Sequence, residues 1–289
     1  MADLLNSAYD LVLSTFRWGV IKVLAIGPVP QHIAFIMDGN RRYARQRSMA
    51  IKEGHTNGFQ ALEKVVDVCL KLGVKCVTVF AFSIENFKRS EEEVAALMEL
   101  AETKLLDFTK ATLHRDGVRV NVLGRMEMLP ESVQKSFRIS QEMTKDNFKH
   151  VLNFCMPYTS QDEITTAVQS AVQEKVCARV TEGDIERYLM TTLGGSPPLN
   201  ILIRSGGAKR LSDFLMWQAS ENVQLHFIPT YWPDIGFWDL FPIIMDYQTK
   251  VWSRQEGKCG SKRWASVGFE CVALIVIVTL FASLTRWRI

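Results

Sequence analysis

Three polar, cationic segments each follow a short apolar run, and their residue types suit the binding of phosphate groups. The first, residues 37–42, combines a carboxylate at Asp38 with a flexible glycine and two adjacent arginines. Mg²⁺ is commonly held by one or two carboxylates, with water and phosphate oxygens completing its shell. Arg41 and Arg42 can form charge-assisted bonds to phosphate. The segment therefore suits a magnesium–phosphate site, although Asp38-Gly39-Asn40 taken alone is also a common turn sequence.

The second and third segments have a similar composition. Residues 82–89 end an apolar run with serine, asparagine and arginine, and residues 204–212 contain two glycines, two serines and three cations. Backbone N–H groups in such a segment can cradle an anion that the arginines also pair with. The chain has no P-loop and no G-x-G-x-x-G motif. Three such segments favour two anionic groups bound side by side, whereas a surface charge cluster is the alternative for any single segment.

The elements that position these segments are predicted from the alternation of short apolar runs with longer helical stretches. This pattern is typical of βαβ units. It predicts an α/β fold: a single open, mainly parallel six-stranded sheet flanked by helices. Ligands of such sheets bind beyond the carboxyl ends of the strands, where the three segments would lie. The predicted strands are 32–37, 76–82, 118–123, 150–155, 201–203 and 224–227, and the predicted helices are 54–72, 91–115, 130–145, 160–173 and 182–192.

The composition of the 289 residues excludes several classes of protein. With 47% hydrophobic and 22% charged residues, the chain is neither disordered nor collagen-like. A net charge of +3 does not indicate a nucleic-acid partner. The six cysteines form no C-x-x-C pair, which removes the usual zinc and redox spacings and favours reduced, buried thiols in a reducing compartment. His114, His150 and His226 have no metal-ligand spacing and are predicted to be structural.

The two ends of the chain differ from its body. Residues 1–26 have apolar positions at helical spacing, which predicts an amphipathic helix that packs on the domain or lies on a membrane surface. Residues 250–265 are rich in basic side chains and form a predicted linker. The apolar run 266–285, with Trp264 and Trp287 beside it, predicts a transmembrane tail anchor that leaves the domain in the cytosol. A buried hydrophobic C-terminal helix is the alternative.

Four motifs are similar to those of one enzyme family. They are HIAFIMDGNRRYA at 32–44, the pair Gly54-His55, AFSIENFKRS at 81–90 and RLSDFLMWQ at 210–218. Together they resemble the cis-prenyltransferase (undecaprenyl diphosphate synthase-like) family, and in particular its eukaryotic dehydrodolichyl diphosphate synthase branch. The likeness runs from about residue 27 to residue 248, so residues 27–249 are expected to form the catalytic domain.

The resemblance implies an enzyme that adds isopentenyl diphosphate repeatedly to an allylic diphosphate such as farnesyl diphosphate. The expected product is a long polyprenyl diphosphate for dolichol synthesis and protein glycosylation, made at the endoplasmic reticulum membrane by a domain that faces the cytosol. The resemblance also implies Mg²⁺ at Asp38 and catalytic roles for Asp38, Asn40 and Asn86. The implied substrate-binding residues are Gly39, Arg41, Arg42 and His55 for the allylic diphosphate, Arg204, Arg210 and Ser212 for isopentenyl diphosphate, and Phe82, Ser83, Glu85 and Arg89 in the second segment.

Three positions depart from the family pattern, because the family usually has charged residues there. They are Ile51, Asn200 and Ala208. Each is expected to remove a charge from the site, which predicts weakened turnover or dependence on a partner. The resemblance implies a homodimer, or a heteromer with a Nogo-B-receptor-like subunit that completes the active site. A non-catalytic or weakly catalytic subunit is the alternative function. Residues 91–105 are expected either to line a tunnel for the growing chain or to pack in the core.

Overall fold

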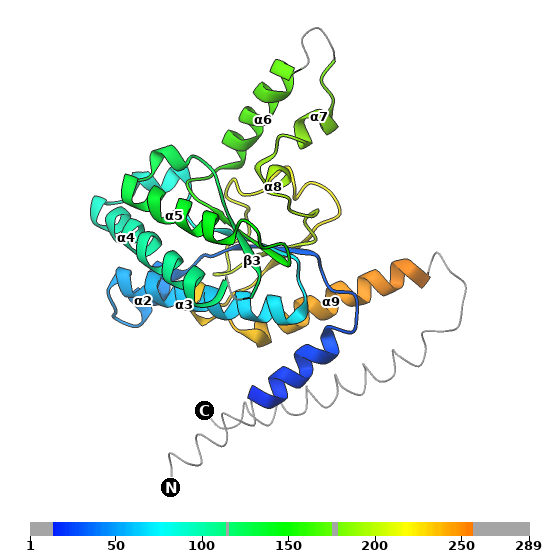
Figure 1. Ribbon diagram of the computed structural model, residues 1–289. Coiled ribbons are helices and arrows are strands. Elements are labelled where there is room, and N and C mark those ends of the chain that lie inside the picture. The colour runs from blue at the N-terminus through cyan, green and yellow to red at the C-terminus, as the bar shows by residue number, and fades with distance from the viewer. Residues whose placement is uncertain (1–13, 114–115, 175–178, 257–289) are drawn as a thin grey trace. The chain divides into compact units, whose positions relative to one another are not determined.

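The computed structural model describes residues 14–113, 116–174 and 179–256 (Figure 1). It divides into two compact units, residues 1–247 and 248–289, and the sheet belongs to the first. All six predicted strands form, in the order β3-β4-β2-β1-β5-β6, and every pairing is parallel. The strands are β1 (His32–Ile36), β2 (Cys76–Phe80), β3 (Val118–Leu123), β4 (His150–Cys155), β5 (Ile201–Arg204) and β6 (Gln224–Phe227). The predicted open α/β sheet is therefore confirmed.

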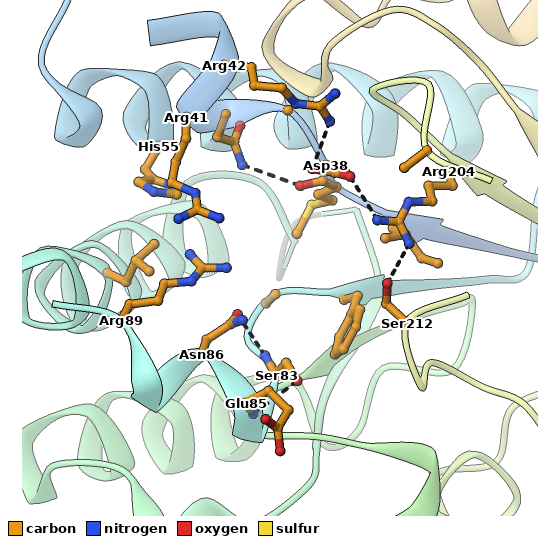
Figure 2. Close-up of a pocket in the computed structure, with 18 of the residues that line it drawn as sticks. Asp38, Arg41, Arg42, His55, Ser83, Glu85, Asn86, Arg89, Arg204 and Ser212 are labelled. Atoms are coloured by element: carbon orange, nitrogen blue, oxygen red, sulfur yellow. Dashed lines mark hydrogen bonds and ion pairs between the residues drawn. The ribbon is translucent and has the colours of Figure 1, made fainter. Parts of the chain in front are cut away.

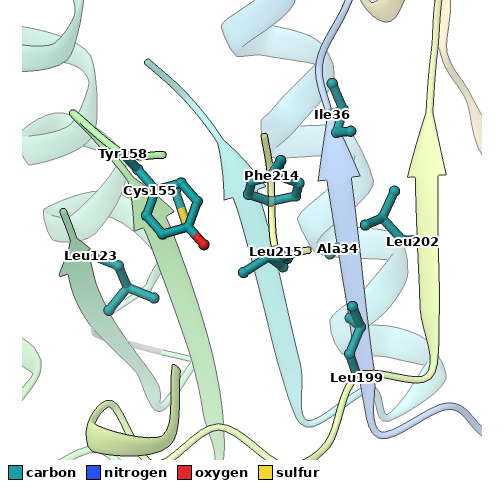
Figure 3. Close-up of a cluster of buried hydrophobic side chains, with 9 residues drawn as sticks. All are labelled: Ala34, Ile36, Leu123, Cys155, Tyr158, Leu199, Leu202, Phe214 and Leu215. Carbon is teal, nitrogen blue, oxygen red and sulfur yellow. The ribbon is translucent and has the colours of Figure 1, made fainter. Parts of the chain in front are cut away.

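Central strands of the sheet are covered on both faces, as parallel sheets require. On one face, the segment that follows β5 supplies Phe214 and Leu215, both fully buried, which pack over the strands (Figure 3). On the other face, Phe35 of β1 packs against the fully buried Trp232 with ring centroids 5.7 Å apart. Trp232 Nε1 also donates to the carbonyl oxygen of Gly58 in α3 (Ile51–Leu72) at 2.7 Å. Trp232 therefore joins α3 to β1.

Most predicted helices form, with altered ends. α3 begins three residues before the predicted start, while α5 (Glu131–Thr144) and α6 (Ser160–Glu174) end within one residue of their predicted ends. The predicted helix 91–115 is α4 (Glu91–Phe108), followed by a π-helical turn (Thr109–Leu113).

The prediction of one helix over 182–192 is wrong, because the structure has α7 (Glu182–Glu186) and α8 (Met190–Leu193) instead. Buried Leu189 has an extended backbone with ψ of 140°. A new helix then begins at Met190, whose N–H donates to Glu163 Oε1 at 2.7 Å.

Several helical elements were not predicted. They are α2 (Asn40–Gln46), α9 (Phe237–Glu256) and the 3₁₀ turns Ile84–Lys88, Met126–Met128 and Trp232–Asp234. Among the seven residues of α2 only Ala44 is buried. The helix therefore has no apolar face that a sequence pattern could reveal. α9 continues to Glu256, so the first residues of the predicted basic linker are helical.

The chain ends are described only in part. Residues 14–24 are helical, and Val20, Ile21 and Leu24 are buried, which favours packing on the domain for this stretch. The rest of the predicted N-terminal helix, most of the linker and the whole predicted anchor 266–285 lie outside the described residues. Within residues 14–113, 116–174 and 179–256, no helix is both long and apolar enough to cross a membrane.

Candidate active site

The three predicted segments meet at the carboxyl edge of the sheet, around a pocket of about 810 Å³ (Figure 2). Two groups of cations lie on opposite sides of it, with Arg41 and Arg89 facing Arg204 across Asp38. The pocket is lined by all but one of the predicted site residues: Asp38, Gly39, Asn40, Arg41, Arg42, His55, Ser83, Glu85, Asn86, Arg89, Arg204, Arg210 and Ser212.

Asp38 is the anionic centre of the pocket. Arg204 Nη2 donates to its Oδ2 at 2.8 Å, and Arg42 Nη2 lies 3.2 Å from its Oδ1. Burial raises the pKa of the Asp38 carboxyl, but the hydrogen bond and charge of Arg204, together with Arg42, outweigh burial and hold the pKa below its usual value. Asp38 is therefore an ionised acceptor over the whole physiological pH range.

Gly39 allows the turn between β1 and α2. Its φ of +110° lies in the region that favours glycine. A Cβ at this position would stand 2.8 Å from Cδ1 of Tyr231, so a side chain would also clash. This turn carries Asp38 and the α2 arginines into the pocket.

Arg204 connects the end of β5 to the third segment. It is 3% exposed, and its Nη1 donates to the carbonyl oxygen of Arg210 at 2.6 Å and to Ser212 Oγ at 2.7 Å. The backbone beyond is strained, since Ser212, Asp213 and Leu215 have φ values of 54°, 59° and 46°. Such a conformation costs a non-glycine residue about 1–2 kcal/mol.

Ser160, the first residue of α6, holds this strained segment. Its N–H donates to the carbonyl oxygen of Asp213 at 2.8 Å, and its Oγ accepts from the N–H of Met216 at 2.8 Å. The pocket edge at Ser212 is therefore fixed by α6 as well as by Arg204.

Glu93, in the first turn of α4, contacts three pocket-lining residues and was missed by sequence reasoning. Its carboxylate lies 2.8 Å from Arg89 Nη1, 3.4 Å from His55 Nε2 and 3.9 Å from Arg41 Nη1. Burial lowers the pKa of His55; Glu93 opposes this effect, while the charges of Arg89 and Arg41 add to it. Acidic residues in a first helical turn normally indicate favourable interaction with the helix dipole, so the sequence carried no separate signal for this role.

The second segment forms a 3₁₀ turn, Ile84–Lys88, at the floor of the pocket. Asn86 Oδ1 accepts from the N–H of Ser83 at 3.1 Å, and Ser83 Oγ accepts from the N–H of Glu85 at 3.2 Å. The Glu85 carboxylate is exposed and paired with Lys88. Phe82 is the one predicted site residue that does not line this pocket: it is 1% exposed and packs against Phe87. Phe82 lines an apolar cavity beside the pocket instead.

The three departures from the family pattern have different outcomes. Asn200 does not belong to the site, because it precedes β5 and its Oδ1 accepts from the N–H groups of Gln31 and His32 at 2.7 and 3.1 Å. The expectation that Asn200 removes a charge from the site is therefore wrong. Ile51 also does not line the pocket, whereas Ala208 does.

In the described parts of the chain, His150, His226, Cys69 and Cys76 have structural surroundings. His150 Nδ1 lies 2.7 Å from the carbonyl oxygen of Val74, and His226 Nε2 lies 3.8 Å from Asp246 Oδ2. His114 lies outside the described residues. Burial raises the pKa of Cys69 to about 12 and that of Cys76 to about 11, so these thiols are unreactive.

The residues around Asp38 fit Mg²⁺ only if phosphate and water oxygens supply most of the metal ligands. Within the described parts of the chain, no three His, Cys, Asp or Glu side chains gather where they could hold a metal ion. A single carboxylate is nonetheless sufficient when water and phosphate oxygens supply the other ligands. The fit therefore depends on a phosphate-containing ligand in the same pocket.

An apolar cavity adjoins the polar pocket. The two share Met37, Asn40, His55, Ala81 and Leu97 in their linings. In the stretch 91–105, Leu97, Leu100, Ala101 and Leu105 line the apolar cavity, whereas Val94 and Met98 line a separate groove with Pro130 and Val133. A polar site that opens onto an apolar cavity suits a ligand with a charged head and a hydrocarbon tail.

Comparisons with known proteins agree with this geometry. Residues 36–255 match the family model described as "Putative undecaprenyl diphosphate synthase". A dehydrodolichyl diphosphate synthase complex subunit of Schizosaccharomyces pombe is 46% identical over 237 residues, covering 79% of this chain and 89% of the relative. The corresponding Homo sapiens subunit is 43% identical over 243 residues, covering 82% of this chain and 72% of the relative.

Solved structures show the same fold. Lavandulyl diphosphate synthase from Lavandula x intermedia, in complex with dimethylallyl diphosphate, superposes with a TM-score of 0.69 at 28% identity, covering 76% of this chain and 95% of that one. A probable undecaprenyl diphosphate synthase from Campylobacter jejuni gives a TM-score of 0.63 at 26% identity, with the same coverage of 76% and 95%. From its sequence, fold and site together, the chain belongs to the undecaprenyl diphosphate synthase-like family of cis-prenyltransferase enzymes.

Proposed function

We propose that this enzyme condenses isopentenyl diphosphate units onto an allylic diphosphate such as farnesyl diphosphate, and that it makes a long dehydrodolichyl-type polyprenyl diphosphate. One observation carries the proposal: a single pocket has cations on both sides of Asp38 and adjoins an apolar cavity. Two diphosphates need two cationic groups, and a growing hydrocarbon chain needs an apolar space.

The allylic diphosphate would bind on the side of Arg41, Arg42 and His55, and isopentenyl diphosphate on the side of Arg204 and Arg210. The cations on the allylic side would stabilise the charge that develops on the leaving diphosphate, because they are already held in place before the reaction. On the isopentenyl diphosphate side, Arg204 is also held in place, since it is buried and bonded to both Asp38 and Ser212.

Mg²⁺ is the proposed cofactor, and Asp38 is the residue that would hold it together with phosphate oxygens. When bound, the ion would supply further electrostatic stabilisation of the leaving diphosphate. Arg204 and Arg42 keep the Asp38 carboxylate ionised and oriented, which prepares it to act as a ligand.

The apolar cavity is proposed to receive the growing chain. Leu97, Leu100 and Leu105 present one face of α4 to it, and Phe154 and Phe137 contribute from β4 and α5. In this structure the cavity measures about 90 Å³, so a long product would require these side chains to move apart.

Membrane attachment through residues 266–285, location at the endoplasmic reticulum with the catalytic domain in the cytosol, and assembly with a second subunit are also proposed. The relatives from Schizosaccharomyces pombe and Homo sapiens are named as subunits of a complex, which supports a heteromer. A Nogo-B-receptor-like subunit is the proposed partner. A purely non-catalytic role is disfavoured, because Asp38 keeps its contacts with Arg42 and Arg204 in the pocket.

The test is incorporation of labelled isopentenyl diphosphate into farnesyl diphosphate by the full chain with Mg²⁺, alone and with a candidate partner subunit. Chain-elongated products are expected in at least one of these conditions. Folded protein that gives no incorporation in either condition would contradict the proposal. Truncation after Arg263 tests the anchor: the shortened chain should leave the membrane fraction, and its retention there would identify another attachment.

A further inference from the structure

The arginines of the pocket differ in the partners of their guanidinium groups. Arg42 and Arg204 contact Asp38, while Arg41 and Arg89 contact Glu93. Two pocket-lining arginines, Arg45 and Arg210, have side chains that form no hydrogen bond or ion pair with any described residue. Arg210 is already assigned to the isopentenyl diphosphate side. Arg45 has no assigned role, although it lines the same pocket.

Arg45 lies in the last turn of α2, four residues after Arg41 and three after Arg42. Residues at these spacings occupy one face of a helix, so Arg45 extends the row of cations that begins at the pocket centre. Arg47, two residues further on, is different. Its Nη2 donates to both carboxylate oxygens of Asp234 at 3.0 and 3.1 Å, its guanidinium lies 3.9 Å from the Tyr43 ring centroid, and it does not line the pocket.

The packing of α2 on α3 explains why Arg45 and His55 reach the same pocket. A Cβ on Gly54 would stand 2.5 Å from the carbonyl oxygen of Asn40 and 2.9 Å from Cβ of Ala44, so only glycine permits this approach. Arg45 follows Ala44 on one helix, and His55 follows Gly54 on the other. Both residues line the pocket beside this contact.

A basic residue in the last turn of a helix can also act only on the helix dipole. That role needs no pocket and leaves ligand affinity unchanged. We propose instead that Arg45 is a diphosphate-binding residue on the allylic side of the pocket, where its uncommitted guanidinium pairs with phosphate oxygens. This inference rests on the proposed function, which identifies the ligand as an allylic diphosphate. Binding of diphosphate by Arg45 can be tested without turnover.

The experiment compares Arg45→Ala, Arg45→Lys and the matched control Arg47→Ala in the full chain, with a partner subunit if turnover needs one. Arg45→Ala should raise the KM for farnesyl diphosphate about tenfold, since a charge-assisted bond to phosphate is lost. The KM for isopentenyl diphosphate should change less than twofold. Arg45→Lys should recover part of the loss, and Arg47→Ala should leave both KM values unchanged.

Calorimetric titration with inorganic diphosphate supplies a second readout that needs no turnover. Arg45→Ala should weaken binding about tenfold relative to the wild type and to Arg47→Ala. Equal affinities, or a changed thermal midpoint with unchanged KM values, would overturn the inference in favour of the dipole role. Failure of the proposed function would appear differently, as a wild-type protein that binds diphosphate but incorporates no isopentenyl units.

Discussion

Two polar clusters are built on the same sheet, and they have opposite characters. The first is the ionic group at the carboxyl edge, where Asp38 contacts Arg42 and Arg204 beside an open pocket. The second is a neutral row within the strands. Thr78 and Asn121 stand opposite Asn153 in the strand register, so the three side chains share one face.

The side chains of the neutral row form hydrogen bonds with one another. Asn153 Nδ2 donates to Thr78 Oγ1 at 2.8 Å, and Asn121 Nδ2 donates to Asn153 Oδ1 at 2.9 Å. His32 joins it, with Nε2 lying 2.7 Å from Thr78 Oγ1. The row also holds the segment that precedes β5, through Ser196 Oγ, which accepts from Asn153 Nδ2 at 2.8 Å.

The difference shows how position along a strand decides the use of a polar side chain. Inside the sheet, an unpaired polar group carries a desolvation penalty of about 1–3 kcal/mol, so the row is satisfied internally and has little left for a ligand. Past the strand ends, side chains face a pocket, and an excess of cations over carboxylates can remain for an anion. The first cluster should therefore control turnover, and the second should control stability.

Breaking the ionic cluster should have the largest effect. Asp38→Asn keeps the size of the side chain and an oxygen for Arg204, but removes the charge, so turnover should fall on the order of a hundredfold to a thousandfold. Steady-state kinetics at saturating Mg²⁺ and thermal denaturation would measure both properties. Turnover near the wild-type value would show that the carboxylate has no role in the reaction.

Acidification should weaken the neutral row at a higher pH than the ionic cluster. Burial lowers the pKa of His32 from 6.5 to about 4, so the unfolded chain binds the proton more tightly than the folded one. The contribution of neutral His32 to the free energy of unfolding is complete above pH 6.5 and is lost as pH falls towards 4. The full pKa difference corresponds to about 3 kcal/mol of stability. The pKa of Asp38 is lowered from 3.8, so its contribution is lost only at still lower pH.

Urea denaturation of the wild type and His32→Gln between pH 7 and 4 would measure this separation. The glutamine can form hydrogen bonds but does not titrate in this range, so its stability should vary less with pH. An equal slope in both proteins would assign the acid sensitivity to other groups.

Breaking the neutral row should reduce stability and spare turnover. Asn153→Leu has a similar volume but leaves Thr78, Asn121 and Ser196 without their partner, which should cost about 2 kcal/mol. For a domain of this size the thermal midpoint should fall by about 4–8 °C. Activity per folded molecule, measured below the transition, should stay within twofold; a larger loss would connect the row to the site.

The smallest effect is expected at the edge of the ionic cluster. Ser160→Ala removes the acceptor for Met216 N–H and loosens the strained segment that carries Ser212. The KM for isopentenyl diphosphate should rise about fivefold, the equivalent of one neutral hydrogen bond of about 1 kcal/mol, while the KM for the allylic substrate stays constant. A uniform change in both values would place the defect elsewhere.

Sequence reasoning succeeded where a local pattern had one physical meaning. Short apolar runs predicted all six strands, because the strands of a parallel sheet are buried on both faces. It failed where partners came from distant parts of the chain. Asn200 was expected to remove a charge from the site, but it bonds to Gln31 and His32, 169 and 168 residues away. The break between α7 and α8 is accompanied by a bond from Met190 to Glu163.

The parallel sheet and the three polar, cationic segments could be predicted from sequence alone, because strand pattern and residue type are local properties. The pairing of the charges, in contrast, follows from tertiary packing. Glu93 contacts Arg89 and Arg41, and Asp38 contacts Arg42 and Arg204, whereas the side chains of Arg45 and Arg210 pair with no described residue. A charge pair depends on distances of 3–4 Å between side chains from separate elements, and these distances exist only once α2, α3, α4 and β5 have packed together.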